Sequence, residues 1–165
     1  GVSKPVLYQH FPGKLELYVA LLDESSAALV ASIRAALAST SDNKLRVQAT
    51  VQAYFDFVDD PGGAFRLIFE SGLTNEAAVR ERVDRTNDEC ASLVSLVIAQ
   101  DTGLTSEEAI LLAAGLGGLA QTAARRGLRD GSAIPKDAAA SLVSTLSWRG
   151  ISRIPRAHPP TDATD

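Results

Sequence analysis

The sequence is poor in the residues that form covalent cross-links and metal sites. It contains one cysteine, two histidines and no methionine among its 165 residues. Cys90 therefore has no partner for an internal disulfide, and together with His10 and His158 it is too little for a structural zinc site. These absences indicate a cytoplasmic protein that uses neither a metal nor another cofactor.

Long apolar runs are also missing. The longest stretch without charge or strong polarity spans residues 109–120, which is shorter than the roughly 18 to 20 residues that a membrane-spanning helix needs. Aromatic residues make up only 5% of the chain, but 45% of the residues are hydrophobic and 22% are charged. This balance is typical of a packed globular domain.

The lack of methionine is informative about the start of the sequence. A natural chain starts with methionine, whereas this sequence starts at Gly1 with the dense run GVSKPVLYQHF. We therefore expect further residues upstream of Gly1 in the intact protein. At the other end, residues 153–165 contain proline and small polar residues and are expected to form a disordered tail.

Helical periodicity runs through most of the sequence, and no alternation typical of strands extends beyond a few residues, so the expected fold class is all-α. A long apolar stripe from Leu15 to Leu37 is interrupted by neither glycine nor proline. Asp42 or Asn43 and Thr74 can serve as N-caps, Thr105 and Glu108 fit a capping box, and Pro135 suits a first helical turn. The second helix is expected to start after Asp42 or Asn43 and to stop at the run 60–63, and the later helices are expected at about 64–71, 75–100, 106–126 and 135–150.

The N-terminal segment combines residue types that suit a DNA groove. With Ser3 as N-cap, a short helix over residues 4–11 would turn Leu7 and Phe11 toward a core and the polar face outward. Glutamine can hydrogen-bond adenine, valine and proline can contact a thymine methyl group, and tyrosine, lysine and histidine can bind phosphates. This face indicates a recognition helix in the major groove, followed by Lys14 at the start of the next helix, where a phosphate is favoured.

The run GVSKPVLYQHFPGKLELYVALL resembles the second half of the helix-turn-helix of TetR-family transcription regulators, including the Tyr-x-His-Phe signature and the lysine that starts the next helix. The resemblance implies a remnant of a DNA-binding domain at 1–22 and a helical effector-binding and dimerisation domain at 23–152. It implies a ligand-responsive homodimeric repressor that binds double-stranded operator DNA and a small apolar effector. The implied DNA contacts are Lys4, Pro5, Val6, Tyr8, Gln9, His10 and Lys14.

The same resemblance implies sites in the remainder of the chain. The last two helices, at about 105–127 and 135–150, would form the dimer interface, and Trp148 would lie either there or in the core. Glycines at 115, 117 and 118 disfavour an exposed helix by up to about 1 kcal/mol each, so we expect them at a subunit interface or beside a ligand. The candidate effector pocket consists of aromatic residues that could equally be plain core: Tyr54, Phe55, Phe65 and Phe69.

Two other interpretations remain open at this point. The net charge of −4 combines +2 for residues 1–14 with −6 for the rest, so the basic N-terminus could be incidental to an all-α small-molecule-binding or interaction module. An enzyme is not expected, because no Ser, His and acid set can be argued from spacing and no strand precedes the run GLGGLA.

Overall fold

The computed structural model describes residues 13–60, 76–127 and 133–154. All regular elements in these ranges are α-helices, which confirms the all-α prediction, and none of them is long and apolar enough to cross a membrane. The expected recognition helix, the helix at 64–71 and the residues after 154 lie outside the described residues. The helices are α2 (Lys14–Ala38), α3 (Asn43–Val58), α5 (Ala77–Thr102), α6 (Ser106–Gly127) and α7 (Lys136–Ile151).

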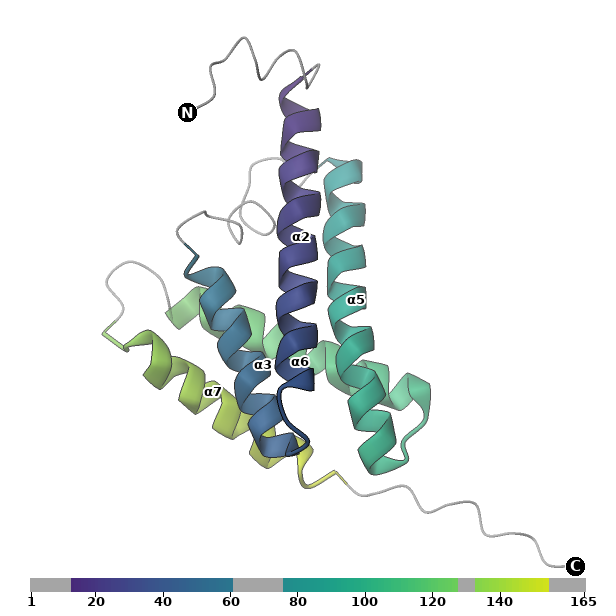
Figure 1. The fold of residues 1–165 in the computed structure, drawn as a ribbon, viewed down its shortest axis with the longest axis vertical. Coiled ribbons are helices and arrows are strands. Elements are labelled where there is room, and N and C mark those ends of the chain that lie inside the picture. The colour runs from purple at the N-terminus through teal and green to yellow at the C-terminus, as the bar shows by residue number, and fades with distance from the viewer. Residues whose placement is uncertain (1–12, 61–75, 128–132, 155–165) are drawn as a thin grey trace, which may run out of the picture.

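Helix α2 packs on both α3 and α5. The long helices α2 and α5 lie side by side along the long axis of the molecule, and their ends near the N-terminus of α2 extend beyond the other helices (Figure 1). Helix α6 crosses behind them, packing mainly on α5, while α7 packs mainly on α3. The body of the molecule is therefore built at one end of α2, and the opposite end of α2 leads toward the N-terminus.

Helix α2 follows the apolar stripe seen in the sequence. Leu22, Leu29 and Ile33 on this stripe are buried, with exposed fractions of 0%, 0% and 1%. They pack with Tyr54 of α3 and Val79 of α5 in one core cluster. The helix runs without a break through residues 22 and 23, so the expected domain boundary lies within a continuous element.

Local capping signals explain the starts of α3 and α6. The Asp42 carboxylate accepts a hydrogen bond from the Leu45 N–H at 2.9 Å, as expected for an N-cap. The Thr105 N–H donates to Glu108 Oε2 at 2.9 Å, and the Glu108 N–H donates to Thr105 Oγ1 at 3.3 Å. This reciprocal pair confirms the capping box, and its hydrogen bonds lower the pKa of Glu108.

The bounds of α5 differ from the expected ones. Glu76 rather than Thr74 is the N-cap residue, in extended backbone and without a side-chain hydrogen bond to the helix. The helix continues past residue 100 to Thr102 and ends where Gly103 adopts a φ of 71°. Glycine takes this left-handed conformation without the steric cost that other residues have, so Gly103 sets the end of α5.

An ion pair joins α5 to α2, and no local sequence pattern predicts it. Arg82 Nε donates to Asp23 Oδ1 at 2.9 Å and to Oδ2 at 3.2 Å, and Arg85 Nη2 lies 3.6 Å from the same carboxylate. These side chains are partly exposed, so the pair adds orientation more than free energy. It joins the two long helices at their surface.

We predict that Leu29→Ala lowers the free energy of unfolding by about 3 kcal/mol, because it removes a fully buried side chain and leaves a cavity between α2 and its neighbours. Leu96→Ala on α5 is the matched control, since Leu96 is 69% exposed, and it should change stability by less than about 0.5 kcal/mol. Urea unfolding followed by circular dichroism measures both. Equal effects of the two substitutions would contradict this description of the core.

Candidate functional site

A cavity of about 500 Å³ lies where α2, α3, α5, α6 and α7 converge. Every helix that the structure describes contributes to its wall, and most of the lining side chains are apolar. Small-molecule sites in proteins commonly have volumes of roughly 300 to 1,000 Å³ and mostly apolar walls. Representative lining residues are Ile33, Val47, Tyr54, Cys90, Leu116 and Trp148.

The glycines of α6 leave part of this space empty. Gly117 and Gly118 line the cavity, and a Cβ atom built on either would meet no atom within 4 Å. Gly115 has equally open surroundings but does not line the cavity. No backbone therefore packs closely on these glycines within the described residues, and at positions 117 and 118 the missing side chains enlarge the cavity.

The structure separates the aromatic residues that the sequence grouped into one candidate pocket. Tyr54 lines the cavity with 4% of its surface exposed. Phe55 is fully buried among Ala124 of α6 and Ala139 of α7 and is absent from the cavity wall. Adjacent residues of a helix point in different directions, which explains the separation. Phe65 and Phe69 lie outside the described residues.

Trp148 on α7 is half-buried and lines the cavity. The sequence offered only an interface or a core position for it. Because the cavity is formed by residues from five helices, a periodic pattern on α7 alone could not show that the indole borders an empty space.

Two buried titratable side chains of the cavity wall, Tyr54 and Cys90, remain neutral. Burial raises the pKa of Tyr54 above its ordinary value, with a smaller contribution from Cys90. Burial also raises the pKa of Cys90 to about 11, with a smaller contribution from the charge of Glu89. The Cys90 thiol is buried, and its raised pKa disfavours the reactive thiolate.

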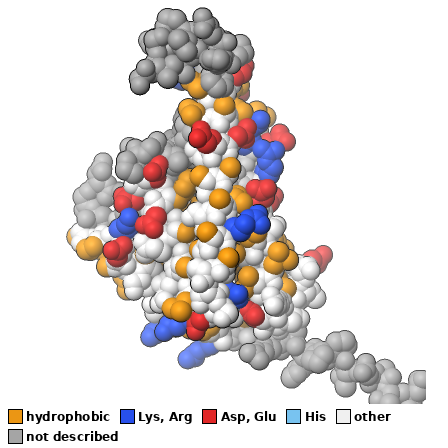
Figure 2. All heavy atoms as spheres, viewed as in Figure 1, with side chains coloured by type: hydrophobic (Ala, Val, Ile, Leu, Met, Phe, Trp, Pro, Cys, Tyr) orange, Lys and Arg blue, Asp and Glu red, His pale blue; other side chains and the backbone are white. Residues whose placement is uncertain are grey.

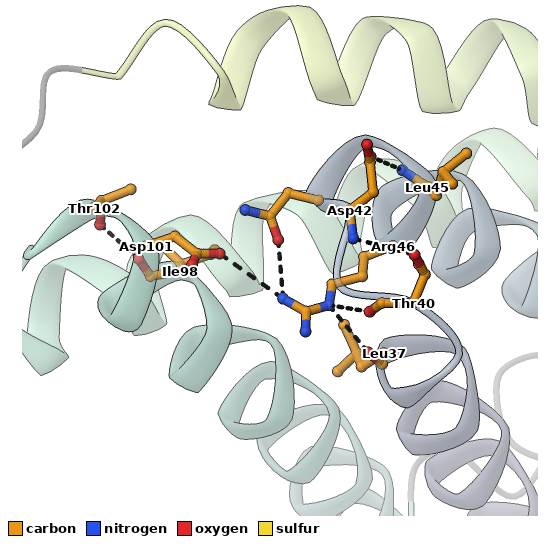
Figure 3. Close-up of polar contacts among 9 residues, drawn as sticks. Leu37, Thr40, Asp42, Leu45, Arg46, Ile98, Asp101 and Thr102 are labelled. Carbon is orange, nitrogen blue, oxygen red and sulfur yellow. Dashed lines mark hydrogen bonds and ion pairs between the residues drawn. The ribbon is translucent and has the colours of Figure 1, made fainter.

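Arg46 holds one edge of the cavity together (Figure 3). Its Nε donates to the carbonyl oxygens of Leu37 at 3.1 Å and Thr40 at 2.8 Å. Its Nη1 donates to Asn43 Oδ1 at 3.0 Å and lies 4.0 Å from Asp101 Oδ2. The guanidinium thus connects the end of α2, the start of α3 and the end of α5, a role that no sequence motif indicated.

Of the seven residues expected to contact DNA, only Lys14 lies among the described residues. It is exposed and is the first residue of α2, directly after the N-cap residue Gly13. It lies at the end of α2 that is remote from α6 and α7 (Figure 1). The visible face of the body carries interspersed charges of both signs (Figure 2). Lys4, Pro5, Val6, Tyr8, Gln9 and His10 lie outside the described residues.

Comparison with known proteins identifies the family. The chain is 40% identical over 155 residues to the HTH-type transcriptional activator FasR of Mycolicibacterium smegmatis, in an alignment that covers 94% of this chain and 71% of FasR. The chain belongs to the TetR family of transcriptional regulators. It is therefore a DNA-binding transcriptional regulator, as its N-terminal segment indicated.

More distant relatives agree with this TetR-family assignment. Nucleoid occlusion factor SlmA of Shewanella woodyi is 27% identical over 117 residues. This alignment covers 67% of this chain and 59% of SlmA. A protein of unknown function from Rhodococcus sp. RHA1 has a similar structure, with a TM-score of 0.59, 26% identity and coverage of 91% of this chain and 79% of that one. No family model matches the chain.

We predict that Arg46→Lys lowers the stability of this TetR-family regulator by about 1 to 2 kcal/mol, because a lysine ammonium cannot reproduce the fork of bonds to two carbonyls and an amide. Asp101→Asn removes only the 4.0 Å ion pair and should cost less than about 0.5 kcal/mol. Thermal unfolding of both variants checks this. A larger loss in Asp101→Asn than in Arg46→Lys would show that the ion pair, not the carbonyl contacts, holds this edge.

Proposed function

We propose that this chain is a ligand-responsive homodimeric regulator whose effector binds in the cavity. The observation that carries the proposal is that α2 both lines the cavity, through Ile33 and Leu37, and begins at the exposed Lys14. A ligand that prefers one arrangement of the cavity wall would bias the position of α2. The regulator would thereby change its affinity for DNA.

The operator contacts are proposed for Lys4, Pro5, Val6, Tyr8, Gln9, His10 and Lys14. Their support is the motif itself, the exposed position of Lys14 at the amino end of α2, and the similarity to a helix-turn-helix activator over nearly the whole chain. Lysine at a helix start can bind a phosphate together with the free backbone N–H groups. Such a regulator acts in the cytoplasm, and no catalytic step is part of the proposal.

Repression is the proposed direction of regulation, as the resemblance to TetR implies. The relative from Mycolicibacterium smegmatis is named an activator. The same DNA contacts can serve either direction, because the outcome depends on where the operator lies relative to the promoter. In vitro transcription from the operator-containing promoter, with and without the intact protein, decides between the two.

An exposed apolar strip on α6 and α7 supports dimerisation through the segments 105–127 and 135–150. Leu111, Leu142 and Leu146 are 73%, 65% and 61% exposed. The exposed Gly115 of α6, which does not line the cavity, leaves room for a close approach of a second helix. Contiguous exposed apolar residues commonly mark protein interfaces, and a two-fold dimer would pair each strip with its own copy.

We predict that Tyr8→Ala, Gln9→Ala and Lys14→Ala, each in the intact protein, weaken operator binding by roughly tenfold or more, because each removes a base or phosphate contact. Lys44→Ala on α3 removes an equal charge from an exposed position away from the N-terminus and is the matched control. Fluorescence anisotropy with operator DNA gives the affinities, and size-exclusion chromatography should show an unchanged dimer.

Wild-type operator affinity in all three variants would overturn the assignment of the DNA contacts. If the intact protein also failed to bind any DNA in a selection from random sequences, the alternative of an all-α small-molecule-binding or interaction module would hold instead.

We predict that Gly117→Leu fills the cavity and lowers the affinity of the protein for the neutral apolar dye Nile red by at least roughly tenfold. The dye would lose an apolar contact area at least as large as that of one leucine side chain, and this loss corresponds to such a factor in affinity. The helix itself should be as stable or more stable, because leucine favours helix more than glycine does. Gly150→Leu, in equally open surroundings on α7 but away from the cavity wall, is the control. Unchanged dye binding by Gly117→Leu would contradict the cavity as effector site.

A further inference from the structure

The hydroxyl of Tyr54 is an unusual group within the cavity wall. Tyr54 is 96% buried and lines the cavity, yet its hydroxyl has no hydrogen-bond partner among the residues that the structure describes. Buried tyrosine hydroxyls ordinarily have a partner, because an unpaired polar group away from water is costly. Tyr54 therefore offers the cavity a hydroxyl that forms no hydrogen bond with the described residues, although only Thr50 Oγ1 in the cavity wall is a fully enclosed oxygen without a partner.

A second unpaired hydroxyl lies one helical turn away. Thr50 lines the same cavity, and its buried Oγ1 atom has no hydrogen-bond partner. Residues four apart on a helix lie on one face, with Cβ atoms about 6 Å apart. Thr50 and Tyr54 thus form a pair of hydroxyls on the face of α3 that borders the cavity.

The charged residues of the cavity wall are partly or fully exposed, and the buried titratable groups beside this pair are neutral. The raised pKa values keep the Tyr54 hydroxyl and the neighbouring Cys90 thiol protonated. Among the charged residues of the wall, Arg46 and Asp101 are partly exposed, with side-chain exposures of 24% and 37%, and Asp88 is exposed. The Arg46 guanidinium already donates to two carbonyls and Asn43. A buried anion would find no unengaged cation beside Tyr54, so a neutral ligand suits the site.

We propose that the effector is an uncharged apolar molecule with one oxygen, as in a ketone or alcohol, and that the Tyr54 hydroxyl donates a hydrogen bond to this oxygen, with Thr50 one helical turn away. This inference rests on the cavity being the effector site. Its energetic signature follows from the missing partners. Removing the Thr50 hydroxyl relieves an unpaired buried group in the empty protein. Removing the Tyr54 hydroxyl breaks no hydrogen bond with the described residues, and either change removes a bond from the complex. Binding should weaken while stability is kept or increased.

The single tryptophan makes binding measurable without a label. Trp148 is the only tryptophan of the chain and lines the cavity. Its fluorescence can be titrated with 2-undecanone, which is neutral and has one carbonyl oxygen, and with undecanoate, which has the same number of carbons but is an anion. The variants are Tyr54→Phe and Thr50→Val. Ser26→Ala is the matched control, because Ser26 Oγ is also buried without a partner but lies away from the cavity wall.

We expect the wild-type chain to bind 2-undecanone more tightly than undecanoate. Tyr54→Phe should weaken ketone binding by roughly fivefold to tenfold, the value of one hydrogen bond, with a thermal midpoint at or above that of the wild type. Thr50→Val should also weaken binding, by a smaller factor. Ser26→Ala should leave binding unchanged.

Contrary outcomes separate this inference from the proposal on which it rests. Equal ketone affinity in the wild type and Tyr54→Phe would overturn the hydrogen-bond assignment while the cavity remained a ligand site. Tighter binding of undecanoate would overturn the neutral ligand. Binding of neither probe would overturn the effector site itself.

Discussion

Helix α2 is the element on which the rest of the structure depends. Its 25 residues form one uninterrupted helix, about 37 Å long. Its last turns line the cavity through Ile33 and Leu37, its middle is buried through Leu29, and its first residue is Lys14. Under the proposed mechanism, a change of packing at the cavity end of this continuous helix would be carried to its amino end. The Asp23–Arg82 pair joins α2 to α5 between these two ends.

The cavity is a region of the interior that side chains do not fill. Protein interiors are ordinarily filled to high density, and an empty volume costs stability through lost contacts. Here Gly117 and Gly118 lack side chains that the space could hold, and the buried Thr50 Oγ1 has no hydrogen-bond partner. These features have no benefit for folding. They are consistent with a site whose contacts are completed by a ligand, and they lie on α6 and α3 rather than on α2 itself.

The sequence predicted the features that depend on near neighbours in the chain. The buried stripe of α2, the N-cap at Asp42 and the capping box at Thr105 each depend on residues within about one turn of one another. The cavity depends instead on how five helices meet, so the sequence could not separate Tyr54 from Phe55. Nor could it show that Arg46 connects three helix ends, because its carbonyl partners are recognisable only after α2 and α3 have packed.

The proposed coupling between the cavity and the N-terminal end of α2 is tested most directly by a distance measurement in the proposed dimer. Spin labels at the exposed Glu16→Cys position, in a Cys90→Ala background, report the separation of the two α2 helices by pulsed electron resonance. The proposed mechanism predicts that this separation shifts when 2-undecanone saturates the cavity, with Trp148 fluorescence confirming occupancy. An unchanged distance distribution at full occupancy would contradict it.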